Sequence, residues 1–271
     1  MPKIAVSTGV ELQYEITGQG DPLLLVMGTA GSIPLWGELT ARLAESHRVI
    51  TFDNRGLGGS ERGEGAISVA SLAADASALL DALEIPRAHL FGWSLGSAIV
   101  QEMALARPEQ CATAGLYATW GRCDGFQRAV LTGLRHPYVT RDLEAALGAG
   151  GIAFSPEALD QPDFAEQVGA MLPFFPQGDA QMQVTVEQWD ADLEHDTLDR
   201  VSEISAPTLV LVGEQDLLTP PWQAKKVADA VPGAQFELLT GPGSSHCLHL
   251  ERPDDVVRCL TTFLAQHPLA G

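Results

Sequence analysis

Long hydrophobic runs are missing from this sequence of 271 residues. The longest apolar stretch is centred on residues 23–27 and has the length of a strand, whereas a membrane-spanning helix needs about 20 apolar residues. The first residues also lack the basic segment followed by an apolar one that marks a secretory signal. We therefore expect a cytoplasmic protein that does not bind membranes.

Basic residues are scarce, because 16 lysines and arginines stand against 35 aspartates and glutamates, which gives a formal net charge of −19. Such a charge repels phosphate backbones and anionic lipid surfaces. Nucleic-acid binding is therefore excluded as the expected function. The acidic residues indicate a solvated surface that keeps the protein in solution.

Cysteine is rare as well, with four residues that form no Cys-x-x-Cys pair: Cys111, Cys123, Cys247 and Cys259. Their wide spacing and the missing secretory signal favour reduced thiols. We expect no metal site and no structural disulfide.

Strand-like and helix-like segments alternate along most of the chain. The expected strands are 10–17, 22–27, 48–52, 88–93, 112–118, 207–212 and 235–239, and the expected helices are 36–45, 68–83, 95–107, 221–231 and 253–266. Repeated strand-helix-strand units predict an α/β fold with a mostly parallel sheet flanked by helices. In such sheets the site lies at the carboxyl ends of the strands.

The alternation stops between residues 122 and 200. Prolines interrupt short amphipathic stretches there, at Pro137, Pro156, Pro162, Pro173 and Pro176. This segment is predicted to be an inserted helical lid. The chain then divides into a first part of the core over 1–121, a lid over 122–200 and a second part of the core over 201–271.

The pentapeptide Gly92-Trp93-Ser94-Leu95-Gly96 stands between an expected strand and an expected helix. This context is typical of a nucleophile elbow, a sharp turn that exposes the serine hydroxyl and leaves no room for side chains two residues to either side. Ser94 is therefore the predicted nucleophile. The alternative is that Ser94 only caps the helix that follows.

A serine nucleophile needs a histidine base and a carboxylate that orients the base. His246 lies in a glycine-rich loop after the last expected strand and is the predicted base, whereas His249 is expected to be packed or at the surface. Asp216 follows the strand at 207–212 and is the predicted acid; Asp124 is the alternative. The chain order serine, aspartate, histidine is that of α/β hydrolases.

The oxyanion of an acyl-transfer intermediate needs two backbone N–H donors. One is expected from Leu95, the residue after the nucleophile. The other is expected from Thr29 in the stretch Gly28-Thr29-Ala30-Gly31, where glycine lets the backbone come close to the site. The alternative for this stretch is an ordinary glycine-rich turn.

With these motifs the sequence resembles the α/β-hydrolase fold family over essentially its whole length. Residues 52–60 resemble the DxRGxGxS turn of the family, a structural brace, and His246 with Glu251-Arg252-Pro253 resembles its histidine loop. The resemblance implies an eight-stranded sheet and points to the branch of cofactor-free haloperoxidase-like hydrolases, enol-lactonases and small carboxylesterases. Met27-Gly28-Thr29 departs from the His-Gly that many members carry at this place.

The resemblance and the predicted triad imply a serine hydrolase that cleaves a carboxylic ester or lactone through an acyl-enzyme, without a cofactor. An apolar set is expected to line the substrate pocket: Trp93, Trp120, Phe126, Phe174, Phe175, Trp189, Leu217 and Leu218. A C–C bond hydrolase, an acyltransferase or a perhydrolase could use the same triad, and a ligand receptor without turnover is a further alternative. The oligomeric state is left open.

Overall fold

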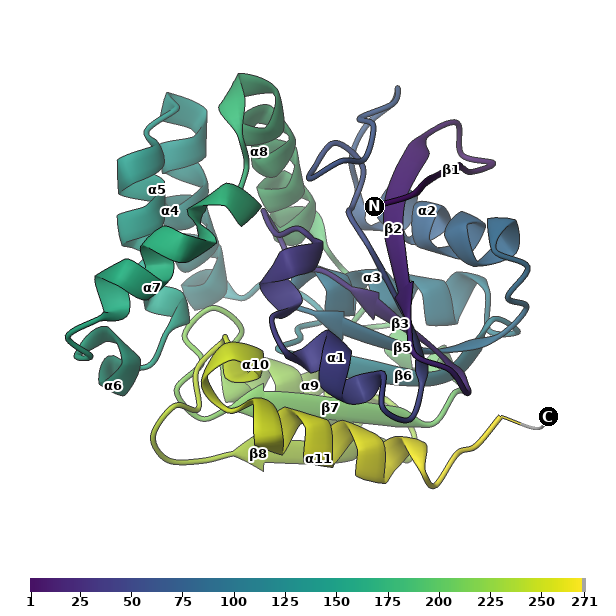
Figure 1. Ribbon diagram of the computed structural model, residues 1–271. Coiled ribbons are helices and arrows are strands. Elements are labelled where there is room, and N and C mark those ends of the chain that lie inside the picture. Colours follow the sequence, from purple (N-terminus) through teal and green to yellow (C-terminus); the bar gives the residue numbers. More distant parts are fainter. Residues whose placement is uncertain (270–271) are drawn as a thin grey trace.

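The computed structural model describes residues 1–269, and an eight-stranded sheet runs through its centre (Figure 1). The strand order is β1-β2-β4-β3-β5-β6-β7-β8; β1 and β2 are antiparallel to their neighbours and all other pairs are parallel. The strands are β1 Lys3–Ala5, β2 Glu11–Thr17, β3 Pro22–Val26, β4 Arg48–Phe52, β5 Ala88–Trp93, β6 Cys111–Tyr117, β7 Thr208–Gly213 and β8 Gln235–Leu239. The predicted mostly parallel sheet of eight strands is confirmed, and the short β1 was not among the expected segments.

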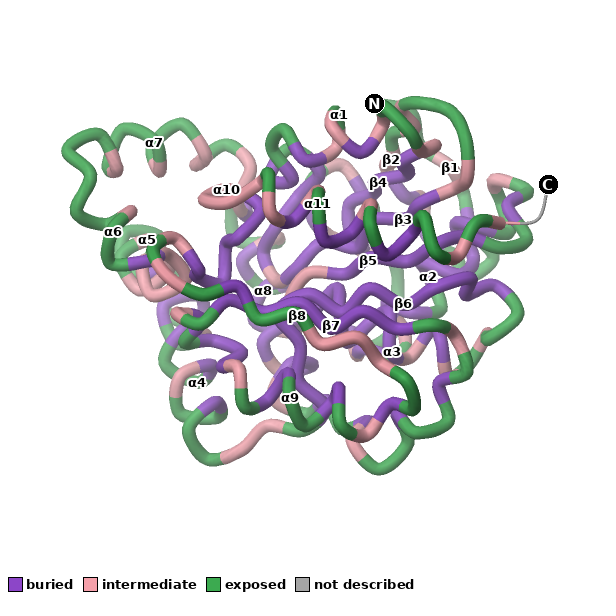
Figure 2. The backbone as a smooth tube through the Cα atoms, turned by 90° about the horizontal axis from the view of Figure 1, so that it is seen from below, coloured by how far each residue is buried: buried purple, intermediate pink, exposed green. Residues whose placement is uncertain are grey.

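Helices cover both faces of the sheet (Figures 1 and 2). On one face lie α2 (Val69–Ala82), α3 (Leu95–Ala106) and α9 (Pro221–Ala230); on the other lie α1 (Leu39–Leu43) and α11 (Pro253–Leu264), with the short α10 (Leu248–Glu251) just before α11. Every residue of β6 is buried. A strand that is covered on both faces is apolar along most of its length, so β6 lacks the alternation of polar and apolar residues that a half-exposed strand shows.

Five helices stand between β6 and β7, over the carboxyl ends of the strands (Figure 1). They are α4 (Gly125–Thr140), α5 (Leu143–Gly150), α6 (Pro156–Leu159), α7 (Phe164–Met171) and α8 (Gly178–Glu194). The longest two, α4 and α8, pack through a small core of their own that includes Leu131, Leu134 and Met182. This is the inserted helical lid that the proline-rich segment predicted. One proline behaves differently from the prediction, because Pro137 lies inside α4.

The expected helix over 36–45 is broken in the structure. A short 3₁₀ helix, η1, spans Ile33–Trp36, and α1 begins only at Leu39. Gly37 between them has a φ of 56°, which ends the first turn and which other residues adopt at a cost. The chain is thereby bent so that Leu35 and Trp36 enter the core.

The turn at residues 53–60 is a buried brace. The carboxylate of Asp53 accepts hydrogen bonds from the amides of Ile33 (2.8 Å) and Gly59 (2.9 Å). Arg55 pairs with Asp75 of α2 through two bonds of 2.5 Å, with both side chains buried. Buried ions require partners, and here the charges of Arg55 and Asp75 neutralise each other. The brace thus joins the end of β4 to η1 and α2.

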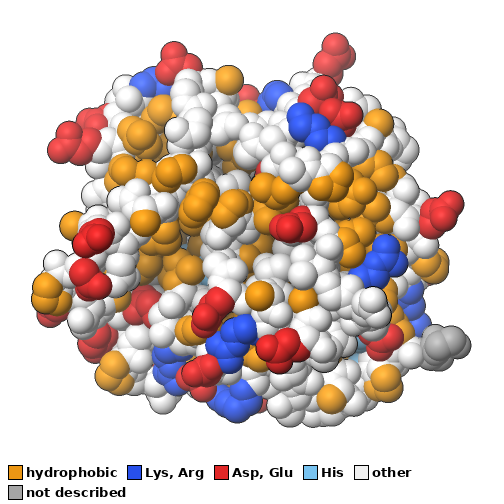
Figure 3. Space-filling model, viewed as in Figure 1, with side chains coloured by type: hydrophobic (Ala, Val, Ile, Leu, Met, Phe, Trp, Pro, Cys, Tyr) orange, Lys and Arg blue, Asp and Glu red, His pale blue; other side chains and the backbone are white. Residues whose placement is uncertain are grey.

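Acidic side chains are scattered over the face shown in Figure 3, and hydrophobic side chains gather around the lid helices at the left of that view. The four cysteines are free thiols, and three of them are buried. Among the helices of residues 1–269, none is long and apolar enough to cross a membrane.

Candidate active site

Ser94 occupies a strained turn between β5 and α3. Its φ and ψ are 54° and −121°, and its side chain makes no capping hydrogen bond to the helix. A Cβ on Gly92 would lie 2.0 Å from the carbonyl oxygen of Gly96, and one on Gly96 would lie 1.9 Å from that of Val26. Both glycines are therefore required by the backbone packing of the turn. The geometry is that of the predicted elbow; Ser94 stands at the N-cap position of α3, but its side chain does not cap the helix.

His246 and Asp216 come together although 30 residues separate them. His246 Nδ1 lies 2.9 Å from Asp216 Oδ2, and both side chains are buried. The Asp216 carboxylate is held by its own turn, since Oδ1 accepts from the amides of Leu218 and Thr219 (2.9 Å each) and Oδ2 accepts from the Thr219 hydroxyl (2.8 Å). Because Nδ1 of His246 is engaged by Asp216, Nε2 is the ring nitrogen that remains available to another partner.

The loop that carries His246 is fixed to the core. The backbone carbonyl oxygen of His246 accepts hydrogen bonds from Trp93 Nε1 (2.9 Å) and from the Tyr117 hydroxyl (2.8 Å). The carboxylate of Glu251 links this loop to the lid, because it accepts hydrogen bonds from the Ser245 hydroxyl (2.5 Å) and from the Ser155 amide of the lid (3.0 Å). The histidine loop is thus anchored to the sheet and to the lid at once.

The two alternative residues have other tasks. Asp124 caps α4 by accepting from the amide of Gln127 (3.0 Å), so it does not orient a histidine. His249 is fully packed against Trp93, and its Nε2 lies 3.2 Å from the carbonyl oxygen of Leu35. Burial lowers the pKa of His249 to about 3, which keeps its ring neutral. His249 is therefore a packed residue, as predicted.

Of the two expected amide donors, Thr29 lines the cavity together with Ser94, and Leu95 directly follows Ser94 as the first residue of α3. Within residues 1–269 neither amide donates to a protein acceptor. Leu95 opens α3, so its N–H points outward with the free N–H groups of the helix start. Gly28 stands next to Ser94, since an added Cβ would lie 3.2 Å from the Ser94 Cβ. The arrangement leaves both amides for a ligand.

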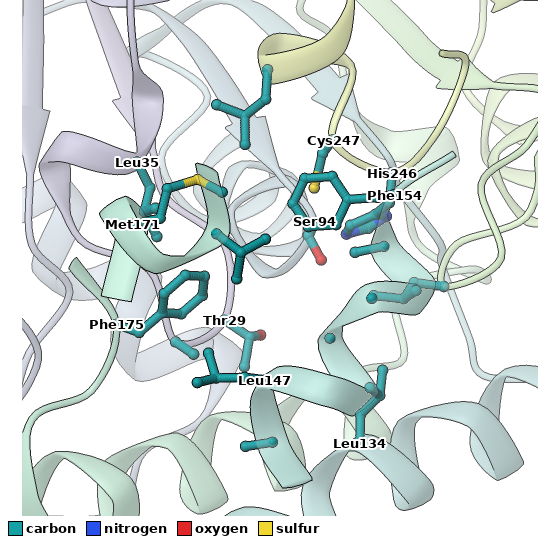
Figure 4. A pocket seen from close by; sticks show the side chains of 18 of the residues that line it. Thr29, Leu35, Ser94, Leu134, Leu147, Phe154, Met171, Phe175, His246 and Cys247 are labelled. Carbon is teal, nitrogen blue, oxygen red and sulfur yellow. The ribbon is translucent and has the colours of Figure 1, made fainter. Parts of the chain in front are cut away.

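A cavity of about 420 Å³ opens beside Ser94 and His246 and extends beneath the lid. Figure 4 shows the Ser94 hydroxyl and the His246 ring facing its open centre, with Thr29 across from them. None of its lining side chains is an aspartate, glutamate, lysine or arginine. The cavity is therefore suited to an uncharged, largely apolar molecule.

Four of the predicted pocket residues line this cavity: Trp93, Phe175, Trp189 and Leu218. Most of the lining contributed by the lid was not predicted from the sequence. The lid supplies small residues at Ala146, Gly148, Gly150, Gly151 and Ala153 and apolar side chains at Leu147, Phe154, Phe164, Val168 and Met171. A run of alanines and glycines in an amphipathic helix was the available signal for them.

The other four predicted pocket residues lie elsewhere, which corrects the prediction. Trp120 is buried in the core against His195, and Phe174, the last residue of the 3₁₀ turn η3 (Leu172–Phe174), packs on the core. Phe126 and Leu217 are each 47% exposed, and Phe126 packs on Trp222. The presence of an aromatic residue or a leucine in the lid or in a loop near the site does not tell whether its side chain points into the cavity, into the core or to solvent.

Two polar residues of α8 were not anticipated. Asp192 accepts a hydrogen bond from the Thr29 hydroxyl (2.6 Å), and Gln188 accepts one from the Ala30 amide (2.9 Å). Burial raises the pKa of Asp192 to about 7. Both residues contact the loop of the predicted second oxyanion donor.

No group of three or more histidine, cysteine or acidic side chains in the described part of the chain is arranged to hold a metal ion.

Comparison with known proteins gives consistent matches over most of the chain. Residues 21–253 match the family model described as the alpha/beta hydrolase fold. The sequence is 33% identical over 267 residues to the putative non-heme bromoperoxidase BpoC of Mycobacterium tuberculosis, covering 94% of this chain and 98% of BpoC. The crystal structure of BpoC matches with a TM-score of 0.84 and 29% identity, over 95% of this chain and 97% of that one.

Two further relatives carry hydrolase names. The putative carbamate hydrolase RutD of Azorhizobium caulinodans is 31% identical over 229 residues, which cover 83% of this chain and 85% of RutD. The 3-oxoadipate enol-lactonase 2 of Acinetobacter baylyi is 30% identical over 251 residues, which cover 90% of this chain and 89% of the lactonase.

Proposed function

This chain belongs to the α/β-hydrolase fold family, and we propose that it is a serine hydrolase that cleaves a carboxylic ester or lactone of a small, largely apolar substrate. The observation that carries the proposal is the arrangement around one cavity. Ser94 stands in it on a strained elbow, beside His246, whose ring is oriented by Asp216 at 2.9 Å. This is the arrangement that acyl transfer through a serine requires.

In the proposed mechanism, His246 takes the proton of Ser94 as the Ser94 oxygen attacks the substrate carbonyl. The amides of Leu95 and Thr29 hold the oxyanion that forms. Collapse of this intermediate breaks the acyl C–O bond, and His246 returns the proton to the leaving alcohol oxygen; in a lactone the alcohol stays attached to the acyl group. Water, deprotonated by the same histidine, then releases the acid.

The cavity supports an uncharged substrate. A substrate with a carboxylate would find no lysine or arginine on its walls and would lose hydration without gaining an ion pair. The names of RutD and the enol-lactonase describe hydrolases, and the similarity to them supports hydrolysis here. In this proposal residues 122–200 form the lid over the site, and 1–121 with 201–271 form the core.

The test is turnover of a panel of p-nitrophenyl esters and aliphatic and acyl-homoserine lactones by the purified protein. Ser94→Ala should lower kcat by about 10⁵-fold or more, as loss of a triad serine does. Ser202→Ala, at an exposed serine, is the matched control and should keep wild-type turnover.

Turnover that survives in Ser94→Ala would reject the mechanism. If no ester or lactone is turned over although a phosphonate probe labels Ser94, ester and lactone hydrolysis is rejected and C–C hydrolysis, acyl transfer or a receptor role takes its place.

A further inference from the structure

The loop after β3 is held by side chains from the lid. Asp192 and Gln188 are four residues apart on α8 and so share one face of the helix. From that face Asp192 Oδ2 accepts from the Thr29 hydroxyl at 2.6 Å, and Gln188 Oε1 accepts from the Ala30 amide at 2.9 Å. Two consecutive loop residues are thus bound to one turn of a lid helix.

The loop needs such support because its backbone is strained. Ala30 has a φ of 64°, in the left-handed region that costs a residue with a side chain about 1 kcal/mol or more. On the side of the core, Asn54 Nδ2 donates to the carbonyl oxygen of Met27 (3.1 Å). On the side of the lid, the side chains of Asp192 and Gln188 accept hydrogen bonds from Thr29 and Ala30, and the Ser32 hydroxyl donates to the Phe174 carbonyl oxygen (2.7 Å).

Asp192 is buried without a cation. Its side chain is 1% exposed, and its Oδ1 has no hydrogen-bond partner in the described protein. Burial opposes the charged form and raises its pKa to about 7, only partly offset by the Thr29 hydroxyl. At and below neutral pH a large fraction of Asp192 is therefore the uncharged acid.

The ionisable groups around Asp192 do not favour its charged form. The Cys123 thiol, whose Sγ lies 3.5 Å from the Asp192 carbonyl oxygen, stays neutral because burial raises its pKa to about 12. The charged residues near α8 point outward and are paired or bound elsewhere: Arg62 with Glu187, Arg135 with Asp190, Arg128 on the Leu193 carbonyl, and Glu102 of α3 with Arg200. His195 is buried and neutral, with its pKa lowered to about 4.

We propose that Asp192, with Gln188, is a positioning residue for the oxyanion loop, holding Thr29 and Ala30 from the lid in the conformation that leaves the Thr29 amide free. The inference rests on the proposed function, since it takes Thr29 as an oxyanion donor. An ionised Asp192 would place a negative charge beside the donor that must stabilise a second negative charge. Ionisation of Asp192 therefore weakens catalysis without removing substrate binding.

Asp192→Asn tests the charge, because asparagine keeps the shape and the acceptor for the Thr29 hydroxyl and cannot ionise. The measurement is kcat and KM from pH 6 to 9 with an ester that the wild type turns over. If it is a p-nitrophenyl ester, it is read at the isosbestic wavelength of p-nitrophenol. The wild-type kcat should fall by about tenfold between pH 6.5 and 8.5, and Asp192→Asn should lose this alkaline decrease.

Asp192→Leu tests the positioning, because it removes the hydrogen bond to Thr29 altogether. We expect kcat to fall by about tenfold or more at pH 6.5, with KM changed by less than about threefold. Asp190→Asn makes the same acid-to-amide change as Asp192→Asn on the outer face of α8, where Asp190 pairs with Arg135, and should keep the wild-type profile.

The outcomes separate this inference from the proposed function. An unaltered alkaline decrease in Asp192→Asn, with turnover that depends on Ser94, overturns the role of Asp192 alone. A folded Asp192→Leu with wild-type kcat overturns it equally. Turnover that persists in Ser94→Ala overturns the proposed function and this inference together.

Discussion

Asp192→Asn should also change how the stability of the protein depends on pH. In the native state the pKa of Asp192 is raised to about 7, against 3.8 for an ordinary aspartate. Between these values the unfolded chain has lost the proton and the native protein has kept it, so the free energy of unfolding falls as pH rises. At about 1.4 kcal/mol per pH unit over roughly three units, the wild type loses about 4 kcal/mol by pH 7. Asparagine removes this loss.

The assay is urea denaturation of wild type and Asp192→Asn, followed by tryptophan fluorescence, from pH 5.5 to 8.5. The difference in the free energy of unfolding, variant minus wild type, should grow by about 2 kcal/mol over this range, because roughly one and a half pH units of the window lie within it. Taking the difference cancels all other groups that titrate. Asp179→Asn, at an exposed aspartate of the same helix, is the control and should show a constant difference. A constant difference for Asp192→Asn would refute the reasoning.

Three further predictions concern the elbow, the cavity and acid stability. Gly96→Ala puts a Cβ 1.9 Å from the Val26 carbonyl oxygen and should lower the free energy of unfolding by about 3 kcal/mol or more, whereas Gly133→Ala, in open space on α4, should raise it by up to about 1 kcal/mol in the same urea titration. Gly148→Val should lower kcat/KM for the longest accepted acyl chains by about tenfold relative to short esters, because its side chain enters free cavity space; Gly133→Val, away from the cavity, should not. Burial lowers the pKa of His195 to about 4, so between about pH 4 and 6.5 this ring is neutral in the folded protein and gains a proton on unfolding. The contribution of His195 to the free energy of unfolding is therefore present above about pH 6.5 and is lost as pH falls towards 4. His195→Gln should make the decrease of the melting temperature below pH 6.5 shallower.

The parts of the molecule that could be predicted are those whose cause is local in the sequence. Gly92 and Gly96 reveal the elbow because their spacing reflects steric contact within a single turn. Asp216 and His246 could be placed because each follows a strand, and parallel strands end at the same edge of the sheet. The expected helix at 36–45 failed for a local reason as well, since Gly37 ends the first turn and apolar periodicity does not register it.

The cavity could not be predicted because its walls depend on how the lid packs. Trp120 and Trp189 look alike in sequence, yet one fills the core beside His195 and the other lines the cavity. Periodicity finds the apolar face of a helix but does not tell which neighbour that face meets. Gly148 matters through the side chain it lacks, a property that becomes visible only once the opposite wall is in place.

Asp192 shows why a buried acid in a lid is the hardest residue to foresee. In the sequence it is one of 35 acidic residues of a strongly negative chain, most naturally read as surface charge. Only the fold brings it against Thr29, 163 positions earlier, and excludes water and cations from around it. Its contact reaches the loop of a proposed oxyanion donor, so under the proposed mechanism the lid contributes to the chemical site as well as to the shape of the pocket. Changes in lid packing near α8 should therefore alter kcat, whereas changes at the residues of α5 that line the cavity should alter the choice of substrate.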